Sequence, residues 1–250
     1  ANRANEVALD QDRRLLTRSI TNHGERILRE LESVALTDQA YRSVRMNFDE
    51  SWIQRRVGLW LKNFFDHDFV FVADSKDSLV YALLGRSSVD PRWFNSILPE
   101  LAPTVDYVRG RAGSSPDRAI RITESGRAKD QPTATRAALI QQFLGRPAVV
   151  AAVLVLPIEG NVEPDEWKTA PIMLTVRFID EEVLGEIANR MQIQNLRKMD
   201  SEAVSPDDHT LDLVDERNNS IARFAWTPKR PGAEIVHSVI PFIAVALAVS

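Results

Sequence analysis

Apolar residues recur at helical spacing through the first 35 positions of the chain. Between about Asn5 and Ala35 the intervals are seven, four and three residues, which gives an α-helix one narrow apolar stripe of Leu9, Leu16, Ile20, Ile27, Leu31 and Val34. Arg13, His23 and Glu30 interrupt a strict heptad. A helix of about 30 residues is about 45 Å long. It is either a surface helix packed on a domain, or a stalk that leaves a membrane, joins a dimer interface and transmits movement.

Two short helical patterns follow. Asp38–Met46 predicts one short helix, and Asp49 is placed to cap the N-terminus of the next helix. That next helix carries Trp52 and Trp60, which lie eight residues apart and therefore share a helix face. One of the two indoles can cover a pocket while the other packs in the core.

Apolar runs that are too short for helices predict a sheet. Phe69–Ala73 has the character of a buried strand, and Leu79–Leu84 returns as a second strand after a turn at Ser75–Ser78. Pro147–Ile158 and Pro171–Ile179 are the most apolar internal segments. We expect them to be central strands of an antiparallel sheet, because a turn-rich segment joins them.

The stretch between these two pairs of strands is less regular. Pro91–Val108 predicts a helix that Pro99 and Pro103 bend or split. Arg109–Arg136 holds seven Lys and Arg residues against three Asp and Glu residues. It lacks interleaved aromatic residues, so a solvated loop is favoured over a site for lipid head groups or nucleic acid. Ala137–Phe143 is interpreted as a short helix.

The last third of the chain alternates a helix with short strands. Asp180–Asn189 predicts a helix with an acidic N-terminus, which Asp180 caps. Arg177 lies between Val176 and Phe178, so its side chain points to the opposite face of the strand, toward either a pocket or solvent. Strands joined in part by a turn at Asn218-Asn219 are expected at Ile193–Met199, Thr210–Val214 and Ile221–Trp226. The predicted fold class is α/β, with a long N-terminal helix and antiparallel sheet layers.

Composition excludes several classes of chemistry. With 44% hydrophobic and 26% charged residues in 250, the chain has the make-up of a globular domain with a substantial core. A net charge of −4 gives no argument for nucleic-acid binding, and the absence of cysteine excludes disulfides, a thiol nucleophile and Cys-based zinc sites. No phosphate-binding glycine loop and no Gly-x-Ser-x-Gly motif is present. We therefore expect neither an enzyme nor a cofactor.

Two further segments invite specific interpretations. Asp66, His67 and Asp68 are adjacent, but neighbouring side chains diverge once a strand begins, so we expect capping carboxylates in a helix-to-strand connection and no metal site. Ile235–Val249 contains only His237 and Ser238 as polar residues. It is shorter than the roughly 20 residues that span a bilayer. It is either a buried terminal element or, as we expect, the start of a transmembrane helix at 233–250, with one domain over 1–232.

Four short motifs in the first third of the chain resemble those of the CHASE4 family of extracytoplasmic sensor domains. They fall in the family's order and at matching spacing, as Val34–Tyr41, Asp49–Trp52, His67–Val70 and Asp74–Tyr81. The family ending is similar to Trp226-Thr227-Pro228 followed by Arg230-Pro231-Gly232. One departure is Leu36-Thr37, which replaces an aromatic pair of the family and makes that pocket wall different here.

This resemblance implies a Cache-type, PAS-like fold and a periplasmic location in a bacterial inner-membrane receptor. It also implies a homodimer through the first helix, anchored in the membrane by flanking helices. A ligand or stimulus would shift the helices and so reach a cytoplasmic output module, either a histidine kinase or a diguanylate cyclase/phosphodiesterase of cyclic-di-GMP signalling.

Candidate ligand-binding residues lie where the short helices are expected to meet the sheet. They are Asp38, Tyr41, Arg45, Trp52, Trp60, Tyr81 and Arg177. Two other functions stay open: an extracytoplasmic protein-binding or structural module without a small ligand, and a soluble hydrolase. The sequence identifies no ligand.

Overall fold

A computed structural model describes residues 2–111, 121–123, 135–158, 166–200, 205–206, 208–215 and 218–228. The chain begins with one long helix, α1 (Asn2–Ala35), of 34 residues. Short helical segments follow as α2 (Asp38–Ala40), η1 (Tyr41–Met46), α3 (Glu50–Ile53), η2 (Gln54–Gly58) and α4 (Leu59–Phe65). The expected Ile235–Val249 segment lies outside the described residues.

A seven-stranded antiparallel sheet forms the body of the protein. Its strand order is β3-β2-β1-β7-β6-β5-β4, and every neighbouring pair is antiparallel. The strands are β1 (Phe69–Ala73), β2 (Leu79–Leu84), β3 (Ser87–Val89), β4 (Arg121–Thr123), β5 (Arg136–Phe143), β6 (Arg146–Leu154) and β7 (Ile172–Phe178). Strands β1 and β7 lie at the centre, so they connect the first hairpin to the later strands.

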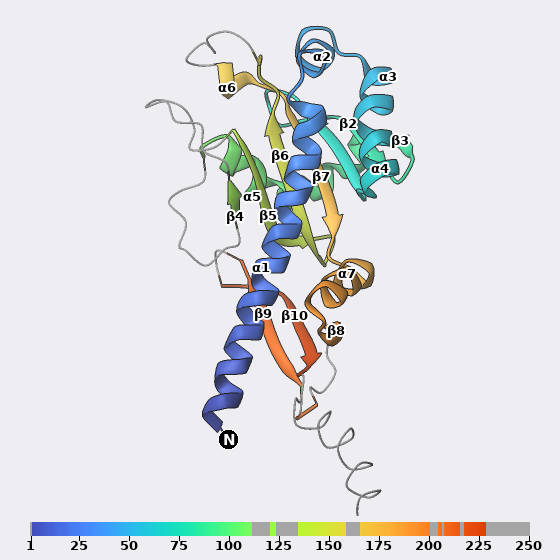
Figure 1. Cartoon of the computed structure of the whole chain (residues 1–250). Helices are drawn as coiled ribbons and strands as arrows, with labels where there is room; N and C mark the ends of the chain where they lie inside the picture. The colour runs from blue at the N-terminus through green and yellow to red at the C-terminus, as the bar shows by residue number, and fades with distance from the viewer. Residues whose placement is uncertain are drawn as a thin grey trace, which may run out of the picture.

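Each face of this sheet is covered by a different set of helices (Figure 1). On one face, α1 and the short helices pack over Val70, Val72 and Met173. On the other face lie η3 (Pro91–Ile97) and α5 (Leu98–Val108), against Phe71, Leu174 and their neighbours. The strict alternation of side chains along β1 and β7 therefore builds two separate apolar cores.

A smaller sheet continues the structure along the N-terminal half of α1 (Figure 1). Its order is β8-β10-β9, with β8 (Gln194–Met199), β9 (His209–Val214) and β10 (Ser220–Thr227). Helix α7 (Glu181–Met191) joins it to the large sheet, and α6 (Glu166–Thr169) precedes β7. The Arg13 Nε donates to the Thr210 carbonyl at 2.8 Å, and the Trp226 indole donates to the Asp12 carboxylate at 3.3 Å. Helix α1 thus spans both sheets.

Most sequence predictions of elements are confirmed. The apolar stripe of α1 is buried at Leu16, Ile20, Ile27 and Leu31. The Asp49 and Asp180 carboxylates accept backbone hydrogen bonds from Trp52 and Val183, as expected for N-caps. The strands at Phe69–Ala73 and Leu79–Leu84, both central strands and the three later strands all form, and the helix after Pro91 is split in two.

The short helix predicted at Ala137–Phe143 is wrong, because this segment is strand β5. Its partner β6 follows after a two-residue turn in which Leu144 and Gly145 both have positive φ. Such turns match the twist of an antiparallel hairpin. Gly145 is the usual residue for that conformation, whereas Leu144 is unusual there, so the turn was not recognisable from the sequence.

The solvated basic loop predicted at Arg109–Arg136 is also wrong where the structure describes it. The Arg109 side chain is buried, and Arg121–Thr123 pairs with β5 as strand β4. A buried guanidinium needs paired carboxylates or carbonyls, and a charge count along the sequence does not reveal them.

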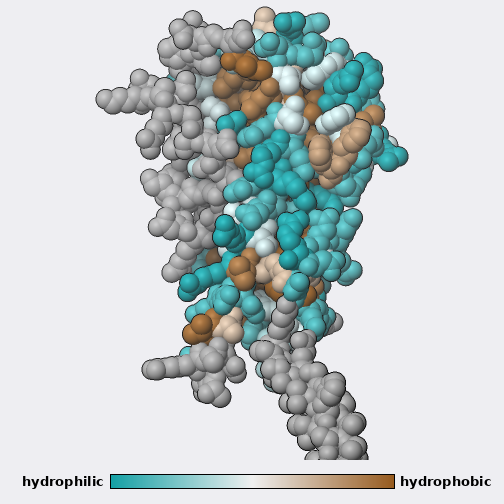
Figure 2. All heavy atoms as spheres, in the orientation of Figure 1, coloured by the Kyte–Doolittle hydropathy of each residue, from teal (hydrophilic) through white to brown (hydrophobic). Residues whose placement is uncertain are grey.

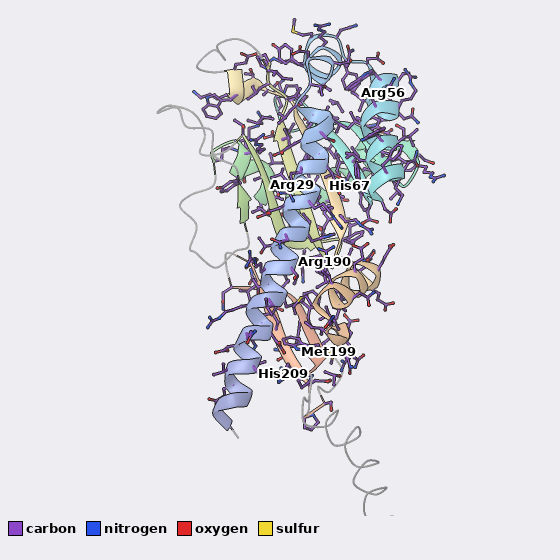
Figure 3. The ribbon with its side chains drawn as sticks, viewed as in Figure 1. Arg29, Arg56, His67, Arg190, Met199 and His209 are labelled. Atoms are coloured by element: carbon purple, nitrogen blue, oxygen red, sulfur yellow. The ribbon has the colours of Figure 1, made fainter. Side chains whose placement is uncertain are left out.

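One buried hydrogen-bonded group fastens α1 to the large sheet. His67 is fully buried after α4, beside α1 (Figure 3). Its Nε2 lies 2.8 Å from Glu30 Oε2 on α1, and its Nδ1 lies 2.6 Å from Thr175 Oγ1 on β7. The Thr175 hydroxyl donates to the Phe69 carbonyl at 2.9 Å, so it accepts from Nδ1. Because the imidazole also bonds Glu30 through Nε2, it is a bridge between α1 and the strands β1 and β7.

Breaking the Glu30–His67 pair is expected to cost about 3–5 kcal/mol in the free energy of unfolding, because each partner would be left buried without the other. Denaturant unfolding of Glu30→Leu, His67→Leu and the double variant measures this. We expect the double variant to lose less than the sum of the single losses, by about 0.5–3 kcal/mol. Glu25→Leu at the exposed Glu25–Arg29 pair is the control. Additive losses in the double variant would show that the pair is not coupled.

His23 lies one α1 turn before Arg26 and is held neutral. Its side chain is buried, and its Nδ1 accepts a 3.0 Å hydrogen bond from Arg26. Burial and the nearby cations Arg26, Arg177 and Arg190 lower the pKa of His23 from 6.5 to about 3. The unfolded chain therefore binds this proton at a higher pH than the folded protein, and stability present above pH 6.5 is lost as the pH falls toward 3.

We expect the free energy of unfolding to fall by about 2 kcal/mol between pH 7 and pH 5 on account of His23. Urea titrations at several pH values test this. His23→Gln keeps an acceptor for Arg26 and should remove that part of the pH dependence, whereas His209→Gln should retain it. An unchanged slope in His23→Gln would contradict the assignment.

Candidate functional site

A cavity of about 370 Å³ lies between α5, η3 and the first hairpin of the large sheet, on the face opposite α1. Its walls are mostly apolar, with Ala73, Leu79, Leu98, Pro99, Leu101, Ala102, Val105 and Leu174. Polar groups join them at Asn95, Asp77, Asp106 and Arg111. An apolar cavity with a few polar groups is the usual form of a small-molecule site.

The charged groups of the cavity form an ion-pair cluster that joins the hairpin to α5. The Arg111 guanidinium lies 2.6 Å from Asp77 Oδ2 and 2.8 Å from Asp106 Oδ1. Arg109 pairs with Asp77 Oδ1 at 2.9 Å. Burial would lower the pKa of Arg111, but the hydrogen bonds to Asp77 and Asp106 outweigh it and raise the pKa. The four charges cancel, so the cluster is neutral as a whole.

The turn between β1 and β2 positions Asp77. The Asp74 carboxylate accepts hydrogen bonds from the backbone amides of Lys76 and Ser78, which closes the turn. Asp77 itself has a φ of 62°, a left-handed conformation that Asp and Asn tolerate better than most residues. This geometry directs its carboxylate toward Arg109 and Arg111.

Arg109 also reaches the short helix α6. Its Nη1 donates to the Trp167 and Lys168 carbonyls at 3.2 Å each, and its Nη2 donates to the Asp74 carbonyl at 3.2 Å. The side chain is only 3% exposed. Because its donors are satisfied by both segments, Arg109 holds the hairpin turn and α6 together.

Some of the candidate residues from the sequence gather on the other side of α6. The Tyr41 hydroxyl donates to Glu166 Oε1 at 3.1 Å, and Arg45 Nη2 donates to Thr169 Oγ1 at 3.2 Å. Arg45 Nε lies 3.8 Å from Glu166 Oε1. Burial and the Glu166 carboxylate raise the pKa of Tyr41. Segment η1 is thereby bound to α6.

The other candidates are dispersed. Asp38 is exposed in the first turn of α2, Trp52 is half-buried against the α1 core, and Trp60 is 39% exposed. Tyr81 is buried against Gly58, where an added Cβ would lie 2.6 Å from its hydroxyl. None of the seven candidates lines the cavity at α5, and their role in binding stays a prediction.

Arg177 faces α1, opposite to Val176 and Phe178 as its position in the strand predicts. It is surrounded by the carboxylates of Asp66, Asp68, Asp180 and Glu182 at 3.4–3.8 Å. Burial would lower the pKa of Arg177, but these carboxylates outweigh it and raise the pKa. The arrangement fixes α7 to the end of α4 and leaves Arg177 engaged with protein carboxylates.

The cavity residues and Arg109 were missed by sequence reasoning. The turn at Ser75–Ser78 and the helix over Pro91–Val108 were predicted, but the sequence does not show that they enclose a cavity. Arg109, directly after that helix, belongs to a segment interpreted as a solvated loop. Hydrophobic periodicity cannot show that Arg109 is buried, because a charged residue is expected at the surface. The only available hint was the position of Asp106 three and five residues before Arg109 and Arg111, at the end of a helix.

A second surface feature is an exposed aromatic face on α4. Phe64 is 64% exposed, and its ring centroid lies 4.2 Å from that of Trp60. Figure 2 shows apolar side chains at the surface in this region, beside the more polar face of α1. Arg55 and Arg56 are exposed on the preceding segment. Exposed apolar patches of this kind commonly mark interaction sites on protein surfaces.

Within the described part of the chain, no cluster of three or more His, Asp or Glu side chains is arranged to hold a metal ion. The Asp66–Asp68 stretch instead supplies structure: the Asp68 carboxylate accepts from the Phe178 amide at 2.8 Å. Among the described helices, none is both long enough and apolar enough to cross a membrane.

Comparison with known proteins adds one finding. The CHASE4 domain family matches residues 19–197, which is well over half of the chain and includes α1 from Ser19, the whole cavity and most of β8. No curated protein matches the chain. The motif resemblance and the α/β fold agree with this match. The chain therefore belongs to the CHASE4 family, the extracytoplasmic sensor domains of signalling receptors.

Proposed function

We propose that this sensor domain receives a small molecule in the cavity between α5 and the first hairpin, and that its occupancy alters the position of α1. The observation that carries the proposal is the cavity itself, with apolar walls and a neutral ion-pair cluster on one side. A compact ligand with an apolar body and at least one polar or charged group fits this lining.

Strand β7 supports a route from the cavity to α1. Leu174 lines the cavity on one face, and the next residue, Thr175, bonds His67 on the other face. His67 in turn contacts Glu30 on α1. A ligand that displaces β1 or β7 would therefore disturb the attachment of α1, provided that it binds two arrangements with different affinity.

The receptor that carries this domain would pass the shift of α1 across the inner membrane of a bacterium. Its output module would be a histidine kinase, or a diguanylate cyclase/phosphodiesterase in cyclic-di-GMP signalling. The domain would act as a homodimer through α1, whose outer face exposes Val7 and Leu15 at 67% and 45%. Flanking membrane helices would anchor it, and the sensor domain itself would not be catalytic.

A protein-binding module without a small ligand is the second candidate. The exposed Trp60–Phe64 pair on α4 favours it, because contiguous aromatic surface with exposed arginines nearby is typical of protein contacts. The two candidates differ in what they need: the first requires the cavity, and the second requires the outer face of α4.

Thermal unfolding of the chain against a library of metabolites, anions and divalent metals distinguishes the two. A ligand at 100 times its Kd adds about 2.7 kcal/mol to stability. For a chain of this size, that raises the unfolding midpoint by roughly 5–10 °C. We expect at least one small organic compound to produce such a shift.

Ala102→Trp, which fills the cavity, is expected to abolish the shift, and Asn189→Trp on the exposed side of α7 is the matched control that should preserve it. A shift that survives Ala102→Trp would place the ligand elsewhere. Absence of any shift across the library would contradict small-molecule reception and favour the protein-binding module.

A further inference from the structure

The cavity and the C-terminal end of α1 lie on opposite faces of the large sheet, yet one short element contacts the surroundings of both. Helix α6 connects β6 to β7, and its four residues carry polar contacts in two directions. The carbonyls of Trp167 and Lys168 face Arg109 of the cavity cluster, whereas the side chains of Glu166 and Thr169 face η1.

On the cavity side, the contact depends on a buried charge. Arg109 is 3% exposed, and its carboxylate partner among the described residues is Asp77, together with three backbone carbonyls from Asp74, Trp167 and Lys168. A buried guanidinium that loses its carboxylate is strongly destabilised. If Asp77 moves, Arg109 must follow it or find other acceptors, and either change alters the bonds that hold α6.

On the α1 side, the contact is a group of side chains around one carboxylate. Glu166 is 13% exposed, accepts from the Tyr41 hydroxyl and pairs with Arg45. Tyr41 follows α2, which begins three residues after α1 ends, and Thr37 between them caps α2 by accepting from the Ala40 amide. A displacement of α6 therefore reaches the end of α1 through a short, hydrogen-bonded segment.

Helix α6 is also packed against the apolar core, in addition to its hydrogen bonds. Trp167 lies against the apolar cluster of the α5 face, and Ala170, directly after the helix, is fully buried. Because Arg109, Tyr41 and Arg45 bond this short helix and Trp167 is packed in the apolar cluster, we expect α6 to move as a unit.

We propose that α6 is a mechanical link that couples the ion pairs of the cavity to η1 and the end of α1, in the order Asp77, Arg109, α6, Glu166 and Tyr41. This deepens the proposed function, since it supplies a route around the edge of the sheet beside the route through β7. Arg109 and Glu166 are positioning residues in it, and Asp77 is the residue that responds to an occupant of the cavity.

Hydrogen exchange on the whole chain tests the link without a ligand. Asp77→Asn keeps a residue that tolerates the left-handed backbone but removes the charge that pairs with Arg109. We expect amides of η1 (Tyr41–Met46) to exchange at least about threefold faster than in the native chain. Asp106→Asn is the matched control, because Asp106 pairs with Arg111 and has no bond to Arg109. It should leave η1 unchanged.

The reverse experiment begins at η1. Tyr41→Phe removes the hydroxyl bond to Glu166 and should accelerate exchange in the turn at Asp74–Ser78. Tyr81→Phe is its control, because the Tyr81 hydroxyl is buried and has no hydrogen-bond partner in the described part of the chain. If Asp77→Asn does not fold, Arg109→Lys replaces it, since lysine keeps the charge but cannot reach all four acceptors.

The link would be overturned if Asp77→Asn left exchange in η1 unchanged and Tyr41→Phe left exchange in the Asp74–Ser78 turn unchanged. That result would not affect ligand reception, which the thermal shift tests separately. Conversely, coupling across α6 without any ligand-induced thermal shift would retain the link and reject the small-molecule function.

Discussion

The attachment of α1 to the large sheet depends on a buried imidazole. His67 lies where α4 ends and β1 begins, and it joins Glu30 of α1 to Thr175 of β7. Apolar contacts alone would allow a helix of 34 residues to slide or rotate on a flat sheet, because hydrophobic burial is not directional. The hydrogen bonds of His67 fix one register, and Arg177 with its four carboxylates fixes α7 beside it.

The cavity is connected to this attachment through strand β7. Strand β7 presents Leu174 to the cavity and Thr175 to His67, so the cavity wall and the attachment of α1 lie one residue apart on opposite faces of the same strand. Helix α6 adds a second connection, from Arg109 to Tyr41, at the end of the sheet. Both connections lead to α1, the element that spans the two sheets and that the proposed function makes responsive to the cavity.

Much of the fold follows from patterns that the sequence displays. The stripe of α1, the capping carboxylates of Asp49 and Asp180 and the apolar strands at β1, β6 and β7 are local signals, and the structure confirms them. The candidate site was harder to predict from the sequence. Strand β5 was predicted as a helix because its turn uses Leu144, and Arg109 was assigned to solvent because its partners come from segments 32 to 59 residues away.

Buried polar groups explain this difference. His67 was recognised as part of a helix-to-strand connection, but its bonds to Glu30 and Thr175 cross 37 and 108 residues of sequence. Tyr41 and Arg45 were selected as candidates and do lie together, although around Glu166 of α6, whose helix was not predicted. Local pattern therefore predicts the elements, while long-range hydrogen bonds and ion pairs determine which of them are joined.

The most direct measurement is the distance between α1 and the sheet when the cavity is filled. The chain has no cysteine, so Arg29→Cys on α1 and Leu84→Cys on β2 accept two spin labels at exposed positions. If occupancy moves α1, the distance distribution in the Ala102→Trp background should shift by on the order of 1–2 Å relative to the native background. The Asn189→Trp background should show no shift. Superimposable distributions in folded Ala102→Trp protein would contradict the account.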